Sequence, residues 1–446
     1  MLHKPDVTAT LARYVAATRW QDIPQEVPHQ AKRSFINLFA VALAGCRTEP
    51  VEIALGSLRE FSGGKQATVI GRNERIDALS AAFLNGAAAN VHDFCDTHLR
   101  TVIHPTAPVA PAVLALAELR KVSGPELLLA FILGNEVQAR IGLAISPQHY
   151  DKGWHITSTC GVFGAAAASG KLLALNERQL VSALGMASTQ SSGLCECLGM
   201  PAKSVSVGNA ARNGLWSALL AARGFDGPAE PLAGRQGFYN ALGDEPNLAL
   251  VTDGLGETFE IMATSYKPYP CGFVIHPVLD CVLDWRCDHP AVEVTRVVVR
   301  GNPLLAHRTD RPAISTGRES QVSLQHAVAA SLVHGAAGLE QFTDACVGDP
   351  RVQTLRRKVE VVRDPQFSTI AAAVELTTSD GTVHRLAQTA ARGSDVNPMS
   401  DNDLEQKLKT AAASLCLDAA PLIEAIWALE TSTDVSRLAL LAVPKE

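Results

Sequence analysis

The sequence lacks the features of several large classes of protein. Its ten cysteines include no CxxC pair, so neither a zinc ribbon nor a thioredoxin-type redox site is indicated. Lys and Arg (39) do not outnumber Asp and Glu (45), so the positive excess expected of a nucleic-acid-binding protein is absent. No apolar run reaches the roughly 20 residues that span a bilayer, and the N-terminus has no apolar signal core. We therefore expect a cytoplasmic protein that binds neither nucleic acid nor membrane.

The composition instead indicates an extensive interior. Hydrophobic residues make up 47% of the 446 residues and charged residues only 19%, which requires a large core or a large subunit interface. Through the first 250 residues, apolar and small residues recur at the spacing of an amphipathic helix. This spacing predicts helices at Val27–Gly45, Leu79–Val91, Pro108–Arg120, Gly124–Leu133, Val162–Leu175, Glu177–Ser188 and Asn209–Gly224, the last with Asn209 as its N-cap.

The pattern changes near residue 265. Val292–Arg300 alternates as a strand does, Val359–Val362 is a second strand candidate, and Ser379–Gly381 separates two alternating runs as in a β-hairpin. Helical patterns recur at His326–Gly335 and after residue 398. We therefore predict a mainly α protein with an α+β part. It comprises a large all-helical domain (1–264), joined by C-terminal helices (398–446), and a smaller α+β domain (265–397).

The first of four polar stretches in otherwise apolar sequence is residues 85–111. Besides His92 and His98, it carries Asp93, Asp96 and His104. A cluster of histidine and aspartate suggests a metal site, but no HxH or HxxxH spacing supports one. A polar loop between two helices is an equal alternative.

The second stretch, residues 149–164, places Tyr150 and His155 with three hydroxyl residues before an Ala-rich helix. Hydroxyls and free backbone N–H groups at the start of a helix favour binding of a carboxylate or phosphate. Ordinary helix capping is the alternative.

Two further stretches each contain one lysine. Lys203 lies among small and apolar residues, where a desolvated ammonium loses its proton more readily or binds an anion. A solvated lysine before a helix is the simpler interpretation. Lys267 lies in a stiff segment between Tyr266 and Pro268 at the predicted domain boundary, where pockets form preferentially. A rigid linker is the alternative there. Together the four stretches suit an anionic substrate and proton transfer.

Read in order, these motifs resemble the MmgE/PrpD family over nearly the whole chain. The similarity is carried by NGAAANVHDFCDTHLRTVIHPTAPVAPAVLALAE, GWHITSTCGVFGAAAASGKLLAL, KSVSVGNAARNGLWSALLAARGFDGPAEPLAGRQGF, YKPYPCGFVIHPVLD and ESQVSLQHAVAASLVHG. The resemblance implies a helical domain plus a smaller α+β domain, usually in a homodimer. It implies 2-methylcitrate dehydration, cis-aconitate decarboxylation or iminodisuccinate epimerisation as the kind of activity. These reactions take place on a small di- or tricarboxylate, at a carbon next to a carboxylate. The resemblance implies that they need neither a metal nor an organic cofactor.

The resemblance also implies the site residues and shows three departures. Cys95-Asp96 stands where the family usually has two aspartates, and His326 stands where decarboxylase-like members have a tyrosine. Pro-Thr-Ala-Pro after His104 differs from the HPxDN form of methylcitrate dehydratases, which disfavours that substrate. The family's pocket residues correspond to Asp93, His104, His155, Lys203 and Lys267. Tyr150 matches a tyrosine of epimerase-like members. We also expect His326 to bind the substrate.

Removing a proton next to a carboxylate requires a positioned base and stabilisation of the enolate-like charge. We therefore predict that Lys203 and His104 bind substrate carboxylates, and that Lys267 and Tyr150 transfer protons. His155 serves either binding or acid catalysis. The alternative is a non-catalytic dimer that binds a carboxylate or a partner protein, as the lost aspartate and the exchange at 326 would allow.

Overall fold

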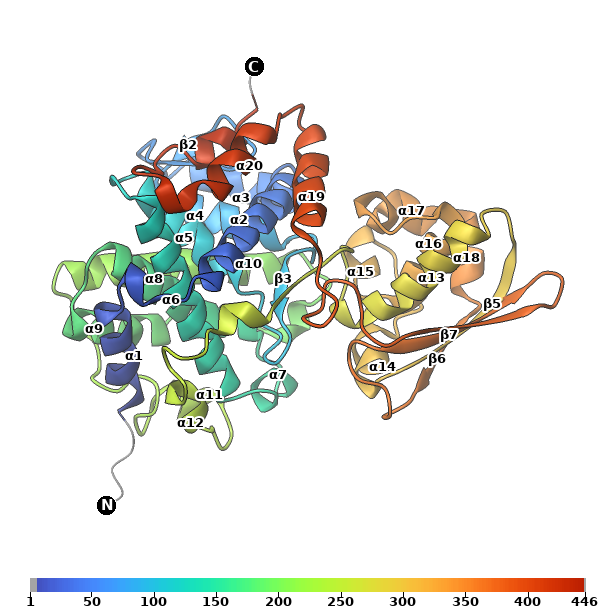
Figure 1. Ribbon diagram of the computed structural model, residues 1–446, viewed down its shortest axis with the longest axis horizontal. Helices are drawn as coiled ribbons and strands as arrows, with labels where there is room; N and C mark the ends of the chain where they lie inside the picture. The colour runs from blue at the N-terminus through green and yellow to red at the C-terminus, as the bar shows by residue number, and fades with distance from the viewer. Residues whose placement is uncertain (1–5, 445–446) are drawn as a thin grey trace.

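The computed structural model describes residues 6–444 and shows a large helical domain beside a smaller α+β domain (Figure 1). Buried apolar side chains form separate cores in the two domains. The helices of the large domain are α1 (Val7–Ala17), α2 (Glu26–Gly45), α3 (Glu49–Arg59), α4 (Ala78–Asn90), α5 (Thr106–Ala117), α6 (Gly124–Leu143), α7 (Gln148–Asp151), α8 (Ile156–Leu172), α9 (Glu177–Ser188), α10 (Ala202–Ala222), α11 (Phe238–Leu242) and α12 (Ala249–Thr252).

The centre of the helical domain depends on small residues. Every residue of α5 is buried, and α6, α8 and α10 pack around it. Helices α6 and α8 cross where Gly134 faces Gly164, and a Cβ on Gly164 would lie 2.7 Å from the Gly134 carbonyl oxygen. The many alanines and glycines therefore allow backbones to approach more closely than larger side chains permit.

This close packing predicts a strong effect of one added methyl group. Gly164→Ala forces the methyl against the α6 backbone, so we expect the free energy of unfolding to fall by about 1–3 kcal/mol. Gly56→Ala, on exposed α3 with no atom within 4 Å of the place its Cβ would take, is the matched control. We expect it to stabilise by about 0.5–1 kcal/mol. Equal urea unfolding curves for the two variants would contradict the packing argument.

The smaller domain is built on a four-stranded sheet of order β6-β5-β7-β8, in which only β5 and β6 are parallel. Helices α13 and α16 pack on the sheet (Figure 1), and strand β7 alternates buried and half-buried residues. The strands are β5 (Val294–Gly301), β6 (Val359–Arg363), β7 (Ala372–Thr378) and β8 (Val383–Gln388), and the helices are α13 (His276–Asp288), α14 (Pro303–Thr309), α15 (Gly317–Ser320), α16 (Leu324–His334), α17 (Asp344–Gly348) and α18 (Pro350–Arg356).

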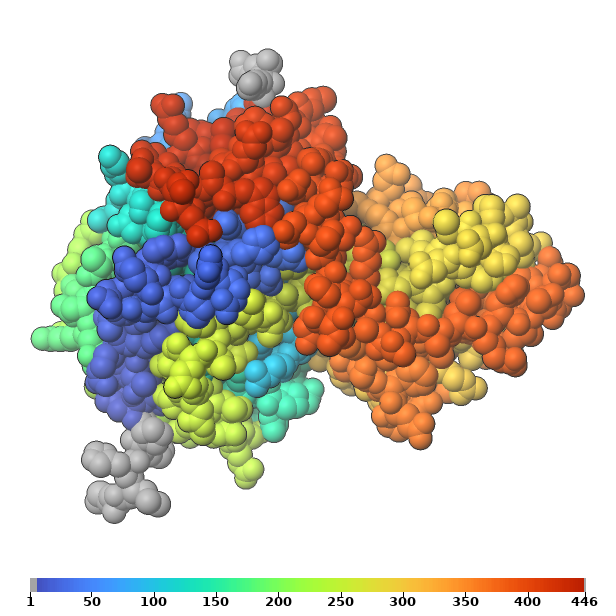
Figure 2. Space-filling model, viewed as in Figure 1, coloured from blue at the N-terminus to red at the C-terminus, as the bar shows by residue number. Residues whose placement is uncertain are grey.

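The chain crosses between the domains twice. After the sheet it returns to the large domain as α19 (Asp401–Ala413) and α20 (Ala420–Trp427), and α19 packs along α2. On the face in Figure 2, the orange-red chain near residue 400 covers the junction. At the first crossing, short strand β3 (Asp96–His98) pairs antiparallel with β4 (Thr264–Tyr266). A two-residue pair, β1 (Ala67–Thr68) and β2 (Arg75–Ile76), lies elsewhere in the large domain.

The structure confirms the predicted fold class and corrects three helix boundaries. Helix α6 continues ten residues past Leu133, because Glu136 and Arg140 form a buried ion pair and Arg140 also binds the carbonyls of Asp253 and Gly254. Helix α8 begins at Ile156 rather than at residue 162. Within residues 6–444, no helix is long and apolar enough to cross a bilayer.

The third correction changes how Lys203 is understood. Helix α10 begins at Ala202, so Asn209 is an interior residue and not the N-cap. The glycines of this stretch serve packing, since a Cβ on Gly208 would lie 2.5 Å from the Phe83 carbonyl oxygen. Lys203 is therefore a buried residue in the first turn of a helix, not a solvated lysine before one.

Candidate active site

The centre of the site is the carboxylate of Asp93, which binds two buried lysines. Lys203 Nζ lies 2.5 Å from Asp93 Oδ1, and Lys267 Nζ lies 2.9 Å from Asp93 Oδ2. The side chains of the two lysines are only 4% and 2% exposed, so this ion cluster is shielded from water. Burial alone would raise the pKa of Asp93, but the ammonium groups of Lys203 and Lys267 hold it well below its usual range. The three groups carry a net charge of about +1 and attract anions.

Local backbone geometry explains how these residues meet. Asp93 follows α4 in the left-handed conformation (φ 51°), which is rare for a non-glycine residue and often marks a functional site. In this conformation Asp93 also turns its carbonyl oxygen toward Lys267, at 2.9 Å from Nζ. Pairing of β3 with β4 sets Asp96 opposite Tyr266, which brings Lys267 beside Asp93 although 174 residues separate them. The start of α10 supplies Lys203.

His104 faces the same carboxylate with a fixed tautomer. Its Nδ1 lies 2.7 Å from the carbonyl oxygen of Asp96 and 3.2 Å from Thr97 Oγ1, while Nε2 lies 3.8 Å from Asp93 Oδ1. A carbonyl only accepts hydrogen bonds, so Nδ1 carries the proton and Nε2 of the neutral ring is free to accept one. Burial and then the two neighbouring ammonium groups lower the pKa of His104 well below its ordinary value. His104 is therefore neutral at neutral pH.

His155 lies behind Lys203 at the N-cap of α8. Its Nδ1 lies 3.1 Å from Ser158 Oγ and 3.4 Å from Ser206 Oγ, and Ser206 in turn donates to the Lys203 carbonyl. Burial, and then Lys203, lowers the pKa of His155 to about 3. His155 is thus close to the cluster, but it does not line the cavity described next.

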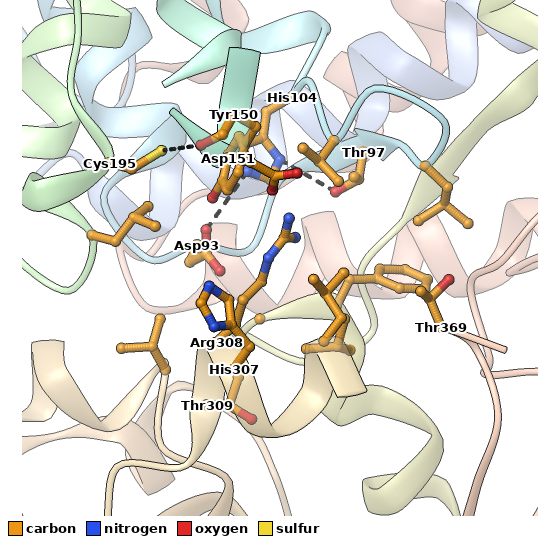
Figure 3. A pocket seen from close by; sticks show the side chains of 18 of the residues that line it. Asp93, Thr97, His104, Tyr150, Asp151, Cys195, His307, Arg308, Thr309 and Thr369 are labelled. Atoms are coloured by element: carbon orange, nitrogen blue, oxygen red, sulfur yellow. Dashed lines mark hydrogen bonds and ion pairs between the residues drawn. The ribbon is translucent and has the colours of Figure 1, made fainter. Parts of the chain in front are cut away.

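A cavity of about 380 Å³ opens over Asp93, Lys267 and His104 between the two domains (Figure 3). Tyr150 on α7 lines the large-domain side, and burial raises its pKa, so the phenol stays protonated. Arg308 on α14 reaches in from the small domain and lies over the Tyr150 ring, at 4.5 Å from its centroid. The cavity thus has cationic groups from both domains and room for a small polar molecule.

His326 does not take part in this arrangement. It is fully buried in α16, where Nε2 lies 2.7 Å from the Gln341 carbonyl oxygen and the ring packs near Phe342. It does not line the cavity. The structure therefore does not bring the predicted substrate-binding residue His326 to the cavity; its side chain is turned toward Gln341 within the small domain.

Sequence reasoning missed a lysine that holds the site together. Lys407 on α19 donates to Asn37 Oδ1 (2.8 Å), to the carbonyl of Phe94 (2.7 Å) and to the carbonyl of Lys267 (2.9 Å). It therefore ties the segment after Asp93 to the segment of Lys267. Burial lowers the pKa of Lys407 to about 7. In the sequence Lys407 looks like any charged residue on a surface helix, so no local signal identifies it.

The buried histidines predict a loss of stability in acid. Burial lowers the pKa of His92 and His326 to about 4 and that of His155 and His276 to about 3. Below a pH of about 6.5 the unfolded chain binds protons at these histidines and the folded protein does not, so stability falls as pH falls. Each such histidine contributes up to about 1.4 kcal/mol per pH unit.

Two buried carboxyls act in the opposite direction. Burial raises the pKa of Asp96 to about 6 and that of Glu136 to about 7, so both favour the folded state on acidification. The histidines outnumber them, and we expect the free energy of unfolding to decrease between pH 7 and pH 5. His276→Gln should reduce this decrease by about 2 kcal/mol in urea titrations at the two pH values. An unchanged difference would contradict the assigned pKa.

Within residues 6–444, no group of three or more histidine, cysteine, aspartate or glutamate side chains is arranged to hold a metal ion. The polar stretch 85–111 instead contributes Asp93 and His104 to the ion cluster described above. Its remaining histidines have other partners: His98 Nε2 pairs with Glu260 at 2.9 Å, and His92 Nε2 contacts the Ala44 carbonyl.

Comparison with known proteins gives matches along the whole chain. The profile of the MmgE/PrpD N-terminal domain matches residues 9–250, and that of the MmgE/PrpD C-terminal domain matches residues 269–431. A cis-aconitate decarboxylase-like protein oryM of Aspergillus oryzae is 30% identical, covering 98% of this chain and 97% of the relative. Cis-aconitate decarboxylase of Mus musculus is 29% identical, covering 98% of this chain and 93% of the relative. A mitochondrial 2-methylcitrate dehydratase of Yarrowia lipolytica is 25% identical, covering 79% of this chain and 73% of the relative. The chain therefore belongs to the MmgE/PrpD family.

Proposed function

We propose that the protein is an MmgE/PrpD-type lyase that acts on a small di- or tricarboxylate at a carbon next to a carboxylate. The observation that carries this proposal is the Asp93 cluster. Asp93, the ammonium group of Lys267 and the neutral imidazole of His104, whose Nε2 is free, line the cavity, and Lys203 binds Asp93 beside it. Full-length relatives that are named decarboxylases support the lyase class.

The cluster supplies both functions that this chemistry requires. Lys267, which lines the cavity, stabilises negative charge that develops on a substrate carboxylate or an enolate-like intermediate. Lys203 does not line the cavity, and it contributes its charge from behind Asp93. His104 Nε2 is the better proton acceptor, because Lys267 is an ammonium group bound to Asp93 and has no free lone pair. We therefore assign proton abstraction to His104 and charge stabilisation to Lys267, which reverses their roles in the prediction made from sequence. His155 helps to position Lys203 through Ser206, whose hydroxyl lies between the His155 ring and the Lys203 carbonyl.

Each possible reaction develops negative charge on the carbon that loses its carboxyl group or its proton, and the same cationic cluster can stabilise that charge. In a decarboxylation, the bond to one carboxyl carbon breaks, carbon dioxide leaves, and an acid delivers a proton to the electron pair left behind. In a dehydration, the base takes a proton and hydroxide leaves from the neighbouring carbon with a proton from an acid. Tyr150, protonated and on the cavity wall, is the candidate acid. Tyr150 also favours a second candidate, epimerisation, which needs a proton donor and a proton acceptor at one carbon.

Incubation of the purified protein with cis-aconitate, 2-methylcitrate and iminodisuccinate in D₂O tests the proposal. Release of carbon dioxide identifies a decarboxylase, loss of water a dehydratase, and deuterium uptake without either an epimerase. We expect lyase turnover with at least one acid. His104→Gln should abolish a dehydration or epimerisation, which begins with proton abstraction, and Tyr150→Phe should slow a decarboxylation, which ends with proton delivery. Binding of these acids without exchange or release would contradict the proposal and favour a non-catalytic carboxylate-binding protein.

A further inference from the structure

Arg308 is a half-buried cationic group in the cavity that the proposed chemistry leaves unused; Arg311 also lines the cavity, but from an exposed position. Within residues 6–444, no carboxylate lies within ion-pair distance of its guanidinium, and no hydrogen bond holds it. Its guanidinium carbon lies 4.5 Å from the centroid of the Tyr150 ring. Stacking occupies the flat face of a guanidinium and leaves the N–H donors at its edge free. Figure 3 shows this side chain extending from α14 into the cavity, toward the side where Asp93, His104 and Tyr150 lie.

The helix that carries Arg308 is held firmly in the small domain. Asn302 caps α14 through a 2.9 Å hydrogen bond to the Leu304 N–H, and its amide also donates to the Phe367 carbonyl at 2.8 Å. Leu305 anchors the helix in the small-domain core. Arg308 is therefore displayed from a fixed position, which reduces the conformational entropy lost when it binds a ligand.

The charges around the cavity suit an anion with two separated negative groups. The Asp93 cluster holds about one net positive charge on one side, and Arg308 provides a second from the small-domain side. Asp151 and Glu196 also line the cavity, but both are exposed residues and neither pairs with Arg308. An edge of free N–H donors binds a carboxylate through two parallel hydrogen bonds.

We infer that Arg308 binds the second carboxylate of the substrate, the one away from the reacting carbon, and thereby makes the protein selective for diacids over monoacids. This inference rests on the proposed function, because it takes the Asp93 cluster as the site of the first carboxylate. It makes Tyr150 a support for the Arg308 guanidinium as well as a proton donor. It also makes the small domain part of substrate recognition.

Binding of succinate and butyrate, two four-carbon acids that differ in one carboxylate, tests the inference without any turnover. By calorimetry we expect wild-type protein to bind succinate at least 10-fold more tightly than butyrate. Arg308→Gln should weaken succinate about 10- to 100-fold and butyrate by less than 2-fold. Arg308→Lys should restore part of the preference, because a lysine keeps the charge but not the paired donors. Arg296→Gln, on the exposed part of β5, is the charge-matched control and should change neither affinity.

The outcomes separate this inference from the proposed function. An unchanged succinate-to-butyrate ratio in Arg308→Gln would overturn the role of Arg308, whether or not wild-type protein turns over an acid in D₂O. Equal weak binding of both acids by wild-type protein would overturn it as well. Conversely, a ratio that collapses in Arg308→Gln supports the inference even if no lyase activity is found. If Arg308→Gln is poorly folded by its thermal unfolding curve, the ratio in Arg308→Lys decides.

Discussion

Lys267→Met is expected to abolish turnover while the protein stays folded. The change removes the ammonium group that faces the cavity next to Asp93, and with it the charge that stabilises the anionic intermediate. Loss of one electrostatic stabiliser in an active site typically costs about 10²–10³ in kcat, and the carboxylate of Asp93 left facing the substrate anion adds to that loss. We therefore expect kcat to fall by at least about 10³.

The fold should survive this change because Asp93 keeps Lys203 as its counter-ion. Methionine also preserves most of the volume and length of the lysine. Circular dichroism and thermal unfolding report the fold, and Lys358→Met, at an exposed position in the small domain, is the matched control. Turnover of Lys267→Met within 10-fold of wild type would remove Lys267 from the mechanism. Measurement of kcat for His155→Ala in the same assay tests whether the contact of His155 with Ser206, and through it with Lys203, is also essential.

Asp93→Asn is expected to have the largest effect on stability. The substitution leaves two buried ammonium groups close together without a counter-ion. Removing one partner of a buried ion pair costs about 3–5 kcal/mol, since the remaining charge is neither solvated nor paired. We expect a decrease of this size in urea unfolding, together with loss of activity.

A double variant separates the charge effect from any other consequence of Asp93→Asn. In Asp93→Asn/Lys203→Met only one ammonium group remains, so part of the lost stability should return, by about 1 kcal/mol or more. The Lys203→Met single variant completes the cycle. If the two substitutions are simply additive in their effects on stability, the ion cluster does not have the energetic role assigned to it.

Local sequence patterns predicted the elements that are stabilised by local packing. Helix α9 was predicted with both of its ends, and the strands around Ser379–Gly381 with their hairpin, because each combines a regular apolar spacing with a clear start or stop signal. The start of α10 was not predicted. Its glycines resemble a loop in sequence, and only contact with α4 and α8 shows that they serve helix packing.

The site shows the same division between local and long-range information. The stretches containing Asp93, His104, Lys203 and Lys267 stand out because polar residues interrupt apolar sequence, and the structure brings these four together. Arg308 and Lys407 have no such signal, since each lies in a run of ordinary helical residues. Arg308 reaches the site because the small domain contacts Tyr150 of the large domain. Lys407 reaches it because the chain returns to the large domain as α19.

The hydrogen bonds of Lys407 have a consequence for the order of assembly. This residue comes 140 positions after Lys267, yet its ammonium group fixes the backbone of that lysine and of the segment after Asp93. A chain that ends before α19 therefore has the Asp93 and Lys267 side chains, but lacks both the hydrogen bonds that join their segments and part of the large-domain core. The arrangement of the candidate site thus depends on residues from the last tenth of the chain, and it is complete only once α19 has docked on α2.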